Sequence, residues 1–198
     1  AANPALARAL RAAGTTALSY DTVQADDGSL PLLTPMSELA GRIAVLAGAH
    51  HLLSSSGGRG VLLAGAPGVP GARVTVLGAG VAGSNAVAQA AAMGAQVTAV
   101  DLSPTALRRL DDRYGGRVRT VASTALAIEE EVLASDLVIG AVLVPGRPAP
   151  TVVSTALIEQ MRRGSVLVDI AIDQGGCFEP SRPTTHTDPV FRVGGALL

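Results

Sequence analysis

The stretch that decides the fold lies between Arg73 and Asp101. It begins Arg73-Val74-Thr75-Val76-Leu77-Gly78-Ala79-Gly80-Val81-Ala82-Gly83 and ends Gln96-Val97-Thr98-Ala99-Val100-Asp101. The β-branched residues of the two outer segments predict buried strands, and the small residues between them predict a helix that stops at Gly94. The glycine pattern thus follows a strand and opens a helix, and an acid ends the next strand about 20 residues later. In that context the pattern predicts a dinucleotide-binding loop.

The three glycines of the loop have separate physical roles. Gly78 permits a tight turn, Gly80 lets a diphosphate approach the backbone, and Gly83 lets the helix pack closely on the strand. The free N–H groups and the dipole of the helix then face the phosphates. Asp101 is expected to accept hydrogen bonds from the adenosine ribose hydroxyls and to repel a 2′-phosphate, which favours NAD over NADP. The alternative is a glycine-rich turn that binds no ligand.

Strands and helices continue to alternate beyond this stretch. We expect further strands at 117–121, 136–141 and 165–169, and helices at 104–114, 124–134 and 154–161. Short strands are also expected at Thr16–Tyr20 and Val61–Ala64. This alternation is typical of an α/β fold with a doubly wound parallel sheet, a Rossmann NAD-binding domain, which we assign to residues 54–198.

The segment before residue 54 is organised differently. Thr34-Pro35 predicts the start of a helix that runs to about Leu53, so residues 35–53 are expected to form a helix connecting two domains. Residues 1–34 are then expected to be a partial segment of the second domain. The first residue is not Met, and we expect the chain to be a piece of a longer polypeptide.

Composition excludes several partners. Lys and Arg number 15 against 16 Asp and Glu, so we expect no nucleic-acid partner. All of the Lys and Arg residues are arginine, which excludes lysine chemistry by this chain. The single cysteine, Cys177, forms no internal disulfide and favours a cytoplasmic location.

The apolar run Leu137–Val144 is too short to cross a membrane. The spacing of Cys177, His186 and Asp188 matches no standard metal site.

Position along the strands predicts further site residues, because ligands of doubly wound sheets lie at the carboxyl ends of the strands. Two acids, Asp101 and Asp173, are expected to border that cleft, with the apolar 141–145 between them. Asp173 lies where a nicotinamide ring would sit and could orient the ribose or substrate, or exchange a proton. An Asx turn before Gly175-Gly176 is the other interpretation, and position alone does not decide between them.

The sequence resembles the alanine dehydrogenase family over nearly all of its length. The matching stretches are Leu32-Leu33-Thr34-Pro35-Met36-Ser37-Glu38, Gly78 to Gly83, Ile139-Gly140-Ala141-Val142-Leu143-Val144-Pro145-Gly146, Val168-Asp169-Ile170-Ala171-Ile172-Asp173-Gln174-Gly175-Gly176 and Ser181-Arg182-Pro183-Thr184-Thr185-His186. The Asp173-Gln174-Gly175-Gly176 stretch is the most specific of these. The related transhydrogenase NAD-binding subunit shares the fold but usually lacks it.

The resemblance implies reversible oxidative deamination of L-alanine to pyruvate and ammonia, with NAD as hydride acceptor, by a homohexamer. It implies that the cofactor is contacted, besides the loop residues Ala79, Val81 and Ala82, by Ser37, Asp101, Ser123, Val142, Leu143 and Ile170. Asp173 would be the catalytic acid beside the nicotinamide, where it helps proton transfer around the imine and carbinolamine steps. For Ser37, hydrogen bonding at the helix start is the ordinary alternative.

The departures from the family limit what the chain is expected to do alone. The family's substrate-binding arginine and lysine and its catalytic histidine lie N-terminal to Ala1, so residues 1–34 would be a remnant of the substrate domain. Ser103 and Ala106 stand where the family often has an asparagine and a basic residue. We therefore expect the NAD-binding part of an L-alanine dehydrogenase, inactive by itself. A non-catalytic NAD(H)-binding module and a transhydrogenase-like subunit are the alternatives.

Overall fold

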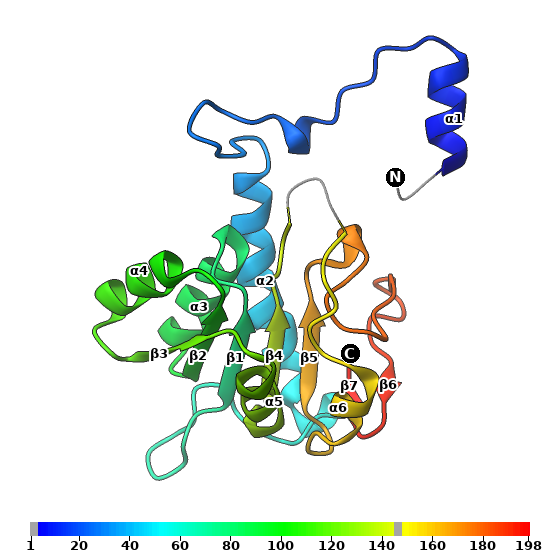
Figure 1. Cartoon of the computed structure of the whole chain (residues 1–198). Coiled ribbons are helices and arrows are strands. Elements are labelled where there is room, and N and C mark those ends of the chain that lie inside the picture. The colour runs from blue at the N-terminus through cyan, green and yellow to red at the C-terminus, as the bar shows by residue number, and fades with distance from the viewer. Residues whose placement is uncertain (1–3, 145–147) are drawn as a thin grey trace. The chain divides into compact units, whose positions relative to one another are not determined.

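The computed structural model describes residues 4–144 and 148–198 and divides the chain into two compact units (Figure 1). The first unit ends at Met36 and contains helix α1 (Pro4–Ala12) and the 3-10 turn η1 (Tyr20–Thr22). The strand predicted at Thr16–Tyr20 is wrong. A strand needs a neighbour for its backbone hydrogen bonds, and no other extended segment of this unit pairs with it within the described residues, which leaves Leu18 92% exposed.

The second unit, Ser37–Leu198, contains the sheet. Its helices are α2 (Thr34–Leu52, which begins in the first unit), α3 (Val81–Ala92), α4 (Pro104–Tyr114), α5 (Ala125–Ala134) and α6 (Thr155–Glu159), with 3-10 turns η2 (Ser54–Ser56) and η3 (Ile172–Gln174). Its strands are β1 (Arg73–Leu77), β2 (Gln96–Asp101), β3 (Val118–Ala122), β4 (Leu137–Gly140), β5 (Val166–Asp169), β6 (Arg192–Val193) and β7 (Ala196–Leu197). Of the helices in the described part of the chain, none has the length and apolar character to span a membrane.

The strand order β3-β2-β1-β4-β5-β7-β6 confirms the doubly wound fold. β1 pairs in parallel with both β2 and β4, so the chain reverses its winding direction between β1 and β4. The register aligns Leu77 with Val100 on one side and with Gly140 on the other. Strands β1, β2, β4 and β5 therefore end at nearly the same level, which defines one carboxyl edge.

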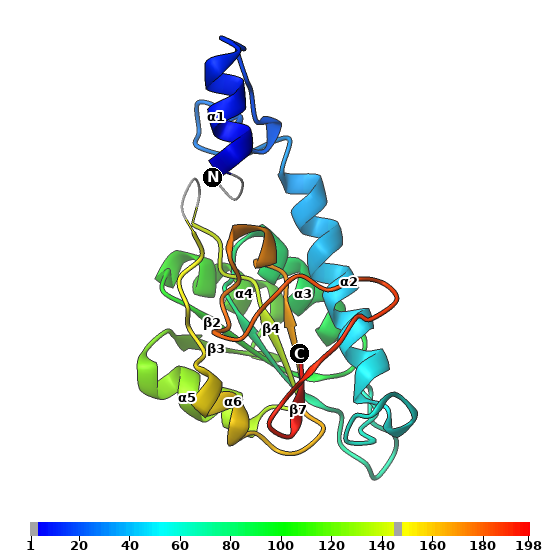
Figure 2. The same ribbon diagram turned by 90° about the vertical axis from the view of Figure 1, so that its right-hand side faces the viewer.

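Both faces of the sheet are covered by helices, as Figure 2 shows with α2 and α3 on one side and α5 and α6 on the other. Alternate residues of a strand point to opposite faces, so Leu137 and Ile139 join the core beneath α2 and α3, whereas Val138 joins the core beneath α5 and α6. Burial on both faces explains why the strands are runs of Val, Ile and Leu rather than alternations with polar residues.

Helix α2 packs on the sheet through glycines. A Cβ on Gly41 would lie 2.1 Å from the carbonyl oxygen of Ala82 in α3, and one on Gly48 would lie 2.5 Å from the Leu137 side chain of β4. Gly41 therefore lets α2 lie directly against the backbone of α3, whereas Gly48 makes room for the Leu137 side chain of β4.

Two short segments differ from the sequence prediction. Val61–Ala64 is a turn rather than a strand, since only Leu63 is buried there and its carbonyl accepts from the Ala72 N–H at 3.0 Å. The β6–β7 hairpin was not predicted, because each strand is two residues long and joins the sheet only through β5.

Asp136 bonds to three segments at the amino ends of the strands: the loop at Arg59, the start of β1 and the start of β5. Its Oδ1 forms an ion pair with Arg59 Nη1 at 2.5 Å, and its Oδ2 accepts from the Arg73 backbone N–H at 2.9 Å. Its own backbone carbonyl accepts from the Val166 N–H at 2.8 Å. The residue is only 7% exposed, so water does not replace these partners.

We predict that Asp136→Ala lowers the free energy of unfolding by about 3 kcal/mol, because it leaves the half-buried Arg59 guanidinium and the Arg73 N–H without their acceptor. Urea denaturation followed by circular dichroism measures this. Asp112→Ala removes an exposed carboxylate from α4 and is the control, with an expected change within about 0.5 kcal/mol. Equal losses of unfolding free energy in the two variants would contradict this structural role of Asp136.

Candidate cofactor site

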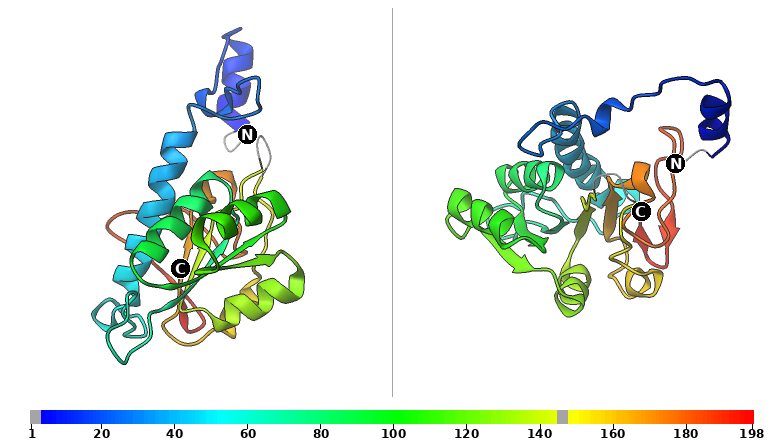
Figure 3. Two further views of the ribbon diagram at one scale, coloured as in Figure 1. Left: turned by 90° about the vertical axis from the view of Figure 1, so that its left-hand side faces the viewer. Right: turned by 45° about the horizontal axis from the view of Figure 1, so that its top comes forward.

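The structure brings most of the predicted site residues into one row. Each of the strands β3, β2, β1, β4 and β5 is followed by a residue at the carboxyl edge, and backbone bonds link these residues across the sheet: Ser123 N–H to Asp101 O (2.9 Å), Gly78 N–H to Val100 O (2.8 Å), Ala141 N–H to Leu77 O (2.8 Å) and Ile170 N–H to Gly140 O (3.0 Å). Neighbouring strands are about 4.8 Å apart, so the row from β3 to β5 spans about 19 Å. Figure 3, right, turns this edge of the sheet toward the viewer.

The glycine loop shows a separate reason for each of its glycines. Gly78 has φ of 101°, and a Cβ there would lie 2.6 Å from the Ala141 carbonyl oxygen. A Cβ on Gly83 would lie 1.8 Å from the Gly78 carbonyl oxygen, which no side chain can tolerate. At Gly80 a Cβ would meet nothing within 4 Å. The first and last glycines therefore serve folding, whereas Gly80 leaves open space beside the backbone.

The N-terminus of α3 differs from those of the helices that follow it. Side-chain hydroxyls cap the others: Ser103 accepts from Ala106 N–H, Thr124 from Ala127 N–H and Ser154 from Leu157 N–H. Gly80 caps α3 without a side chain, so the first N–H groups, those of Val81, Ala82 and Gly83, have no acceptor within the helix. An anion beside Gly80 would meet these donors and the positive end of the helix dipole.

Asp101 organises the loop as well as facing it. Its Oδ2 accepts from the Ala79 backbone N–H at 2.5 Å, and its Oδ1 accepts from the Ser103 N–H at 2.6 Å. A carboxylate has about four acceptor positions, so two of them remain for the hydroxyls of a ribose. The carboxylate thus connects the glycine loop to the start of α4.

Ser37 approaches the same loop from α2. It lies one helical turn before Gly41, on the same face of the helix, and Gly41 contacts the carbonyl of Ala82 in the first turn of α3. Ser37 is half-buried. Ser37 therefore lies on the face of α2 that packs against α3, one turn before the glycine that makes the contact.

The other end of the row carries the apolar residues and Asp173. Val142 and Ile170 are half-buried, and Leu143 is 45% exposed. Asp173 is exposed in η3, and the Oε1 of its neighbour Gln174 is buried without a partner among the described residues. Pro145, the last residue of the predicted apolar stretch, lies outside the described residues. So does Gly146, the last residue of the matching family motif.

Sequence reasoning missed the residue that shapes this end. Asp169, the last residue of β5, accepts from the backbone N–H groups of Ala171, Cys177 and Phe178 and from the Ser181 hydroxyl. The sequence feature that could have identified Asp169 is an acid at the end of a buried strand. Burial, and after it the Asp169 carboxylate, raises the pKa of the Cys177 thiol well above its ordinary value. Cys177 is thus a protonated packing residue rather than a nucleophile.

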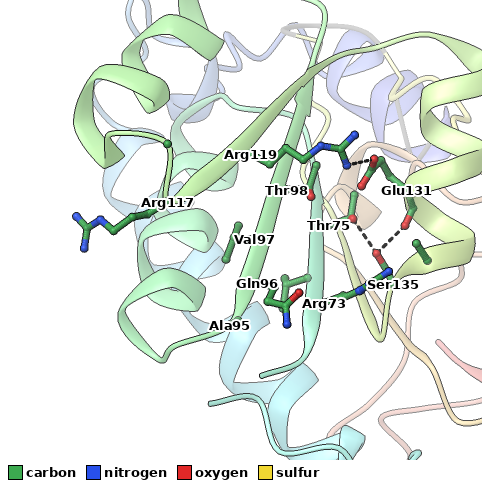
Figure 4. Close-up of a pocket in the computed structure, with 13 residues that line it drawn as sticks. Arg73, Thr75, Ala95, Gln96, Val97, Thr98, Arg117, Arg119, Glu131 and Ser135 are labelled. Atoms are coloured by element: carbon green, nitrogen blue, oxygen red, sulfur yellow. Dashed lines mark hydrogen bonds and ion pairs between the residues drawn. The ribbon is translucent and has the colours of Figure 1, made fainter. Parts of the chain in front are cut away.

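A polar hollow lies at the opposite end of the strands and is distinct from this site (Figure 4). Its lining includes Gln96 and Thr98 of β2 and Arg117, which precedes β3. The polar side chains that line it also bond to one another, since Arg119 pairs with Glu131 and the Ser135 hydroxyl donates to that of Thr75 at 2.7 Å. Its place at the amino ends of the strands is not where doubly wound sheets bind ligands.

Comparison with known sequences identifies relatives of the whole chain. Residues 44–198 match the family model "Alanine dehydrogenase/PNT, C-terminal domain". The alanine dehydrogenase of Mycolicibacterium smegmatis is 57% identical over 190 residues, covering 96% of this chain and 51% of the relative. That of Halomonas elongata is 55% identical, covering 100% of this chain and 53% of the relative. The chain therefore spans about half the length of these curated relatives.

Solved structures agree with the sequence comparison. An L-alanine dehydrogenase superposes with a TM-score of 0.91 and 49% identity, covering 99% of this chain and 54% of that chain. The transhydrogenase of Sinorhizobium meliloti superposes with a TM-score of 0.68 and 33% identity, covering 83% of this chain and 46% of that chain. Together with the uncapped helix and the open space at Gly80, these relatives support NAD as the cofactor of the domain.

We predict that Gly80→Ala and Gly83→Ala have different consequences. Gly80→Ala places a methyl group in the space for the diphosphate, so NADH affinity falls at least about tenfold while the free energy of unfolding changes by less than about 1 kcal/mol. Gly83→Ala drives a methyl group into the Gly78 carbonyl and lowers the free energy of unfolding by more than about 2 kcal/mol. Calorimetric titration and urea denaturation measure the two effects. A stable Gly83→Ala protein would contradict the close packing.

Proposed function

The chain belongs to the alanine dehydrogenase/PNT family, and on that premise we propose that it is the NAD-binding part of an L-alanine dehydrogenase. The single observation that carries the proposal is the row of strand ends at the carboxyl edge, with the uncapped α3 terminus at its centre. The whole enzyme would oxidise L-alanine reversibly to pyruvate and ammonia.

The residues of the row divide between the two halves of the cofactor. The loop from Gly78 to Gly83 would hold the diphosphate at the N-terminus of α3, with Ser37 beside it. Asp101 and Ser123, which end β2 and follow β3, would hold the adenosine ribose and its surroundings. Val142, Leu143 and Ile170 would line the nicotinamide half, since they follow β4 and β5. This division follows from the strand order alone.

Asp173 is the acid that we assign to the chemistry. When bound, NAD accepts a hydride from the substrate carbon that carries the amino group. Asp173 lies in the first turn of η3, beyond the end of β5, and its exposed carboxylate would hold or move a proton beside the reacting carbon. The chain contains no lysine, so the lysine that the family uses for substrate is not among its residues. We therefore expect this chain to bind NADH without oxidising alanine by itself.

We also propose a cytoplasmic location. Cys177 is buried and free, and as the single cysteine it forms no disulfide within the chain, which is typical of proteins from a reducing compartment.

A homo-oligomer is the assembly that we propose, and an exposed apolar stripe on α2 supports it. Leu39, Ile43 and Leu46 are 62%, 59% and 51% exposed. They are four and then three residues apart, a mean spacing of about 3.5, as in a coiled-coil seam. They lie opposite the helix face that Gly41 and Gly48 bury against α3 and β4. The family resemblance implies a hexamer.

A second copy of α2 would fit this stripe. If two copies packed antiparallel about Ile43, Leu39 would lie opposite Ala47 of the second copy, and Leu46 would lie opposite Ala40. Each large side chain then meets a small one, which allows close packing of the helices. The absence of charge along Leu39, Ile43 and Leu46 favours an apolar partner of this kind.

We predict that the chain binds NADH at least about tenfold more tightly than NADPH, because the Asp101 carboxylate accepts from the ribose hydroxyls and repels a 2′-phosphate. Calorimetric titration with both nucleotides tests this. Asp101→Asn, which keeps an acceptor but removes the charge, should reduce the preference. Asp101→Ala also frees the Ala79 N–H and should weaken NADH binding further. If the wild-type chain binds neither nucleotide, the proposed cofactor role fails.

We predict that Ile43→Arg converts an oligomer of the chain to a monomer of 19.8 kDa, because a charge at the centre of the stripe cannot be buried between two helices. Light scattering after size-exclusion chromatography gives the mass. Leu126→Arg changes a residue of α5 that is 65% exposed and lies off the stripe, and this control should keep the wild-type mass. A monomeric wild-type chain, or an unchanged mass in Ile43→Arg, would contradict assembly through α2.

A further inference from the structure

The most heavily hydrogen-bonded carboxylate among the described residues is that of Asp169, at the end of β5. Its Oδ1 accepts from Ala171 N–H at 2.9 Å, and its Oδ2 accepts from Cys177 N–H at 2.8 Å, from Phe178 N–H at 3.1 Å and from the Ser181 hydroxyl at 2.5 Å. The Cys177 thiol approaches Oδ1 at 3.5 Å. These donors come from both sides of η3, so the carboxylate closes the chain between residues 169 and 181 into a loop.

The loop is tightly packed at Gly176 and Cys177, where it meets the ends of β5 and β4. A Cβ on Gly176 would lie 2.9 Å from the Asp169 Oδ2 and 2.7 Å from the Ser181 Cβ, and Gly176 has φ of 80°. Cys177 is fully buried, and its sulfur occupies the space where a Cβ on Gly140 would stand, 2.3 Å away. The base of the loop is therefore fixed against the end of β4.

The loop also holds the chain that returns toward β5. Ala149 N–H donates to the Gln174 carbonyl at 2.8 Å, and Val152 N–H donates to the Cys177 carbonyl at 2.8 Å. A displacement of the loop would thus move η3, with its exposed Asp173, and the segment beside it together.

We propose that Asp169 is a positioning residue that sets the nicotinamide half of the site by fixing the loop that carries Ile170 and Asp173. This inference rests on the proposed function, because it assigns the loop to the nicotinamide. The carboxylate would act through the N–H and O–H groups that donate to it rather than by touching the reacting atoms. The adenosine half is organised separately, since the Ala79 N–H of the glycine loop bonds to Asp101 rather than to Asp169.

The separation of the two halves provides the test. NADH reaches both halves, whereas ADP-ribose has the adenosine and diphosphate but no nicotinamide. Asp169→Asn keeps the size of the side chain but replaces one acceptor oxygen by an amide NH₂, which faces a backbone N–H donor. We expect Asp169→Asn to weaken NADH binding about tenfold and to leave ADP-ribose binding within about twofold of wild type, both measured by calorimetric titration.

Further variants and a spectroscopic measurement separate positioning from general instability. Ser181→Ala removes one donor from the same carboxylate and should weaken NADH binding by a smaller factor, again without an effect on ADP-ribose. The fluorescence of bound NADH comes from its nicotinamide, so the emission spectrum of the complex should change in Asp169→Asn. Asp112→Asn, on the exposed face of α4, is the matched control and should bind both ligands as wild type does.

Each outcome decides the inference. A loss of NADH binding alone, with altered emission, supports it. Equal losses of NADH and ADP-ribose binding would mean that Asp169 only stabilises the domain, and unchanged binding of both would mean that the loop is held without it; either result overturns the inference while leaving the proposed function in place. Failure of the wild-type chain to bind NADH would overturn both.

Discussion

The first turn of α3 lies so close to its neighbours that side chains are excluded from the contact. A Cβ on Gly83 would stand 1.8 Å from the Gly78 carbonyl oxygen, and one on Gly41 would stand 2.1 Å from the Ala82 carbonyl oxygen. Strand β1, helix α3 and helix α2 therefore meet through backbone alone. This contact puts the uncapped N–H groups of α3 at the centre of the carboxyl edge. Packing thus explains Gly78 and Gly83, whereas Gly80 is the glycine of the loop beside which open space remains.

Two strand-ending carboxylates organise the loops on either side of that centre. Asp101 on β2 accepts from Ala79 and Ser103, and Asp169 on β5 accepts from Ala171, Cys177 and Phe178. In both cases a charge at the end of a buried strand satisfies backbone donors that the turn would otherwise leave unpaired. The difference is in reach: Asp101 connects residues close to the glycine loop, whereas Asp169 gathers a loop that extends to Ser181. Each side of the carboxyl edge therefore has its own carboxylate that fixes the adjoining loop.

The sequence predicted what depends on local pattern. The bounds of β1 and β2 match the prediction, because runs such as Arg73–Leu77 are β-branched and buried on both faces. Thr16–Tyr20 was also predicted as a strand, but a strand requires a neighbour for its hydrogen bonds, and the residues of the segment do not show whether one is present. The same limit applies to the site. Positions at strand ends, such as Asp101 and Ile170, follow from the alternation of elements. The partners of Asp169 did not follow, because they lie up to 12 residues away across a loop of irregular conformation.

The exposure of Asp173 and its neighbours bears on the expectation that this chain binds NADH without oxidising alanine. Asp173 is exposed, Leu143 is 45% exposed and Val81 is 43% exposed, so within residues 37–198 water reaches the row from the diphosphate loop to η3. Hydride transfer and proton exchange beside a charged ring are favoured where water is excluded and the local dielectric is low. On the proposed function, groups other than those of this unit have to close over Asp173 and bind the amino acid. Relatives about twice as long as this chain have the additional residues to do so. On this proposal the unit supplies an exposed row of donors and acceptors for the dinucleotide, and the groups that would exclude water from the reaction lie outside it.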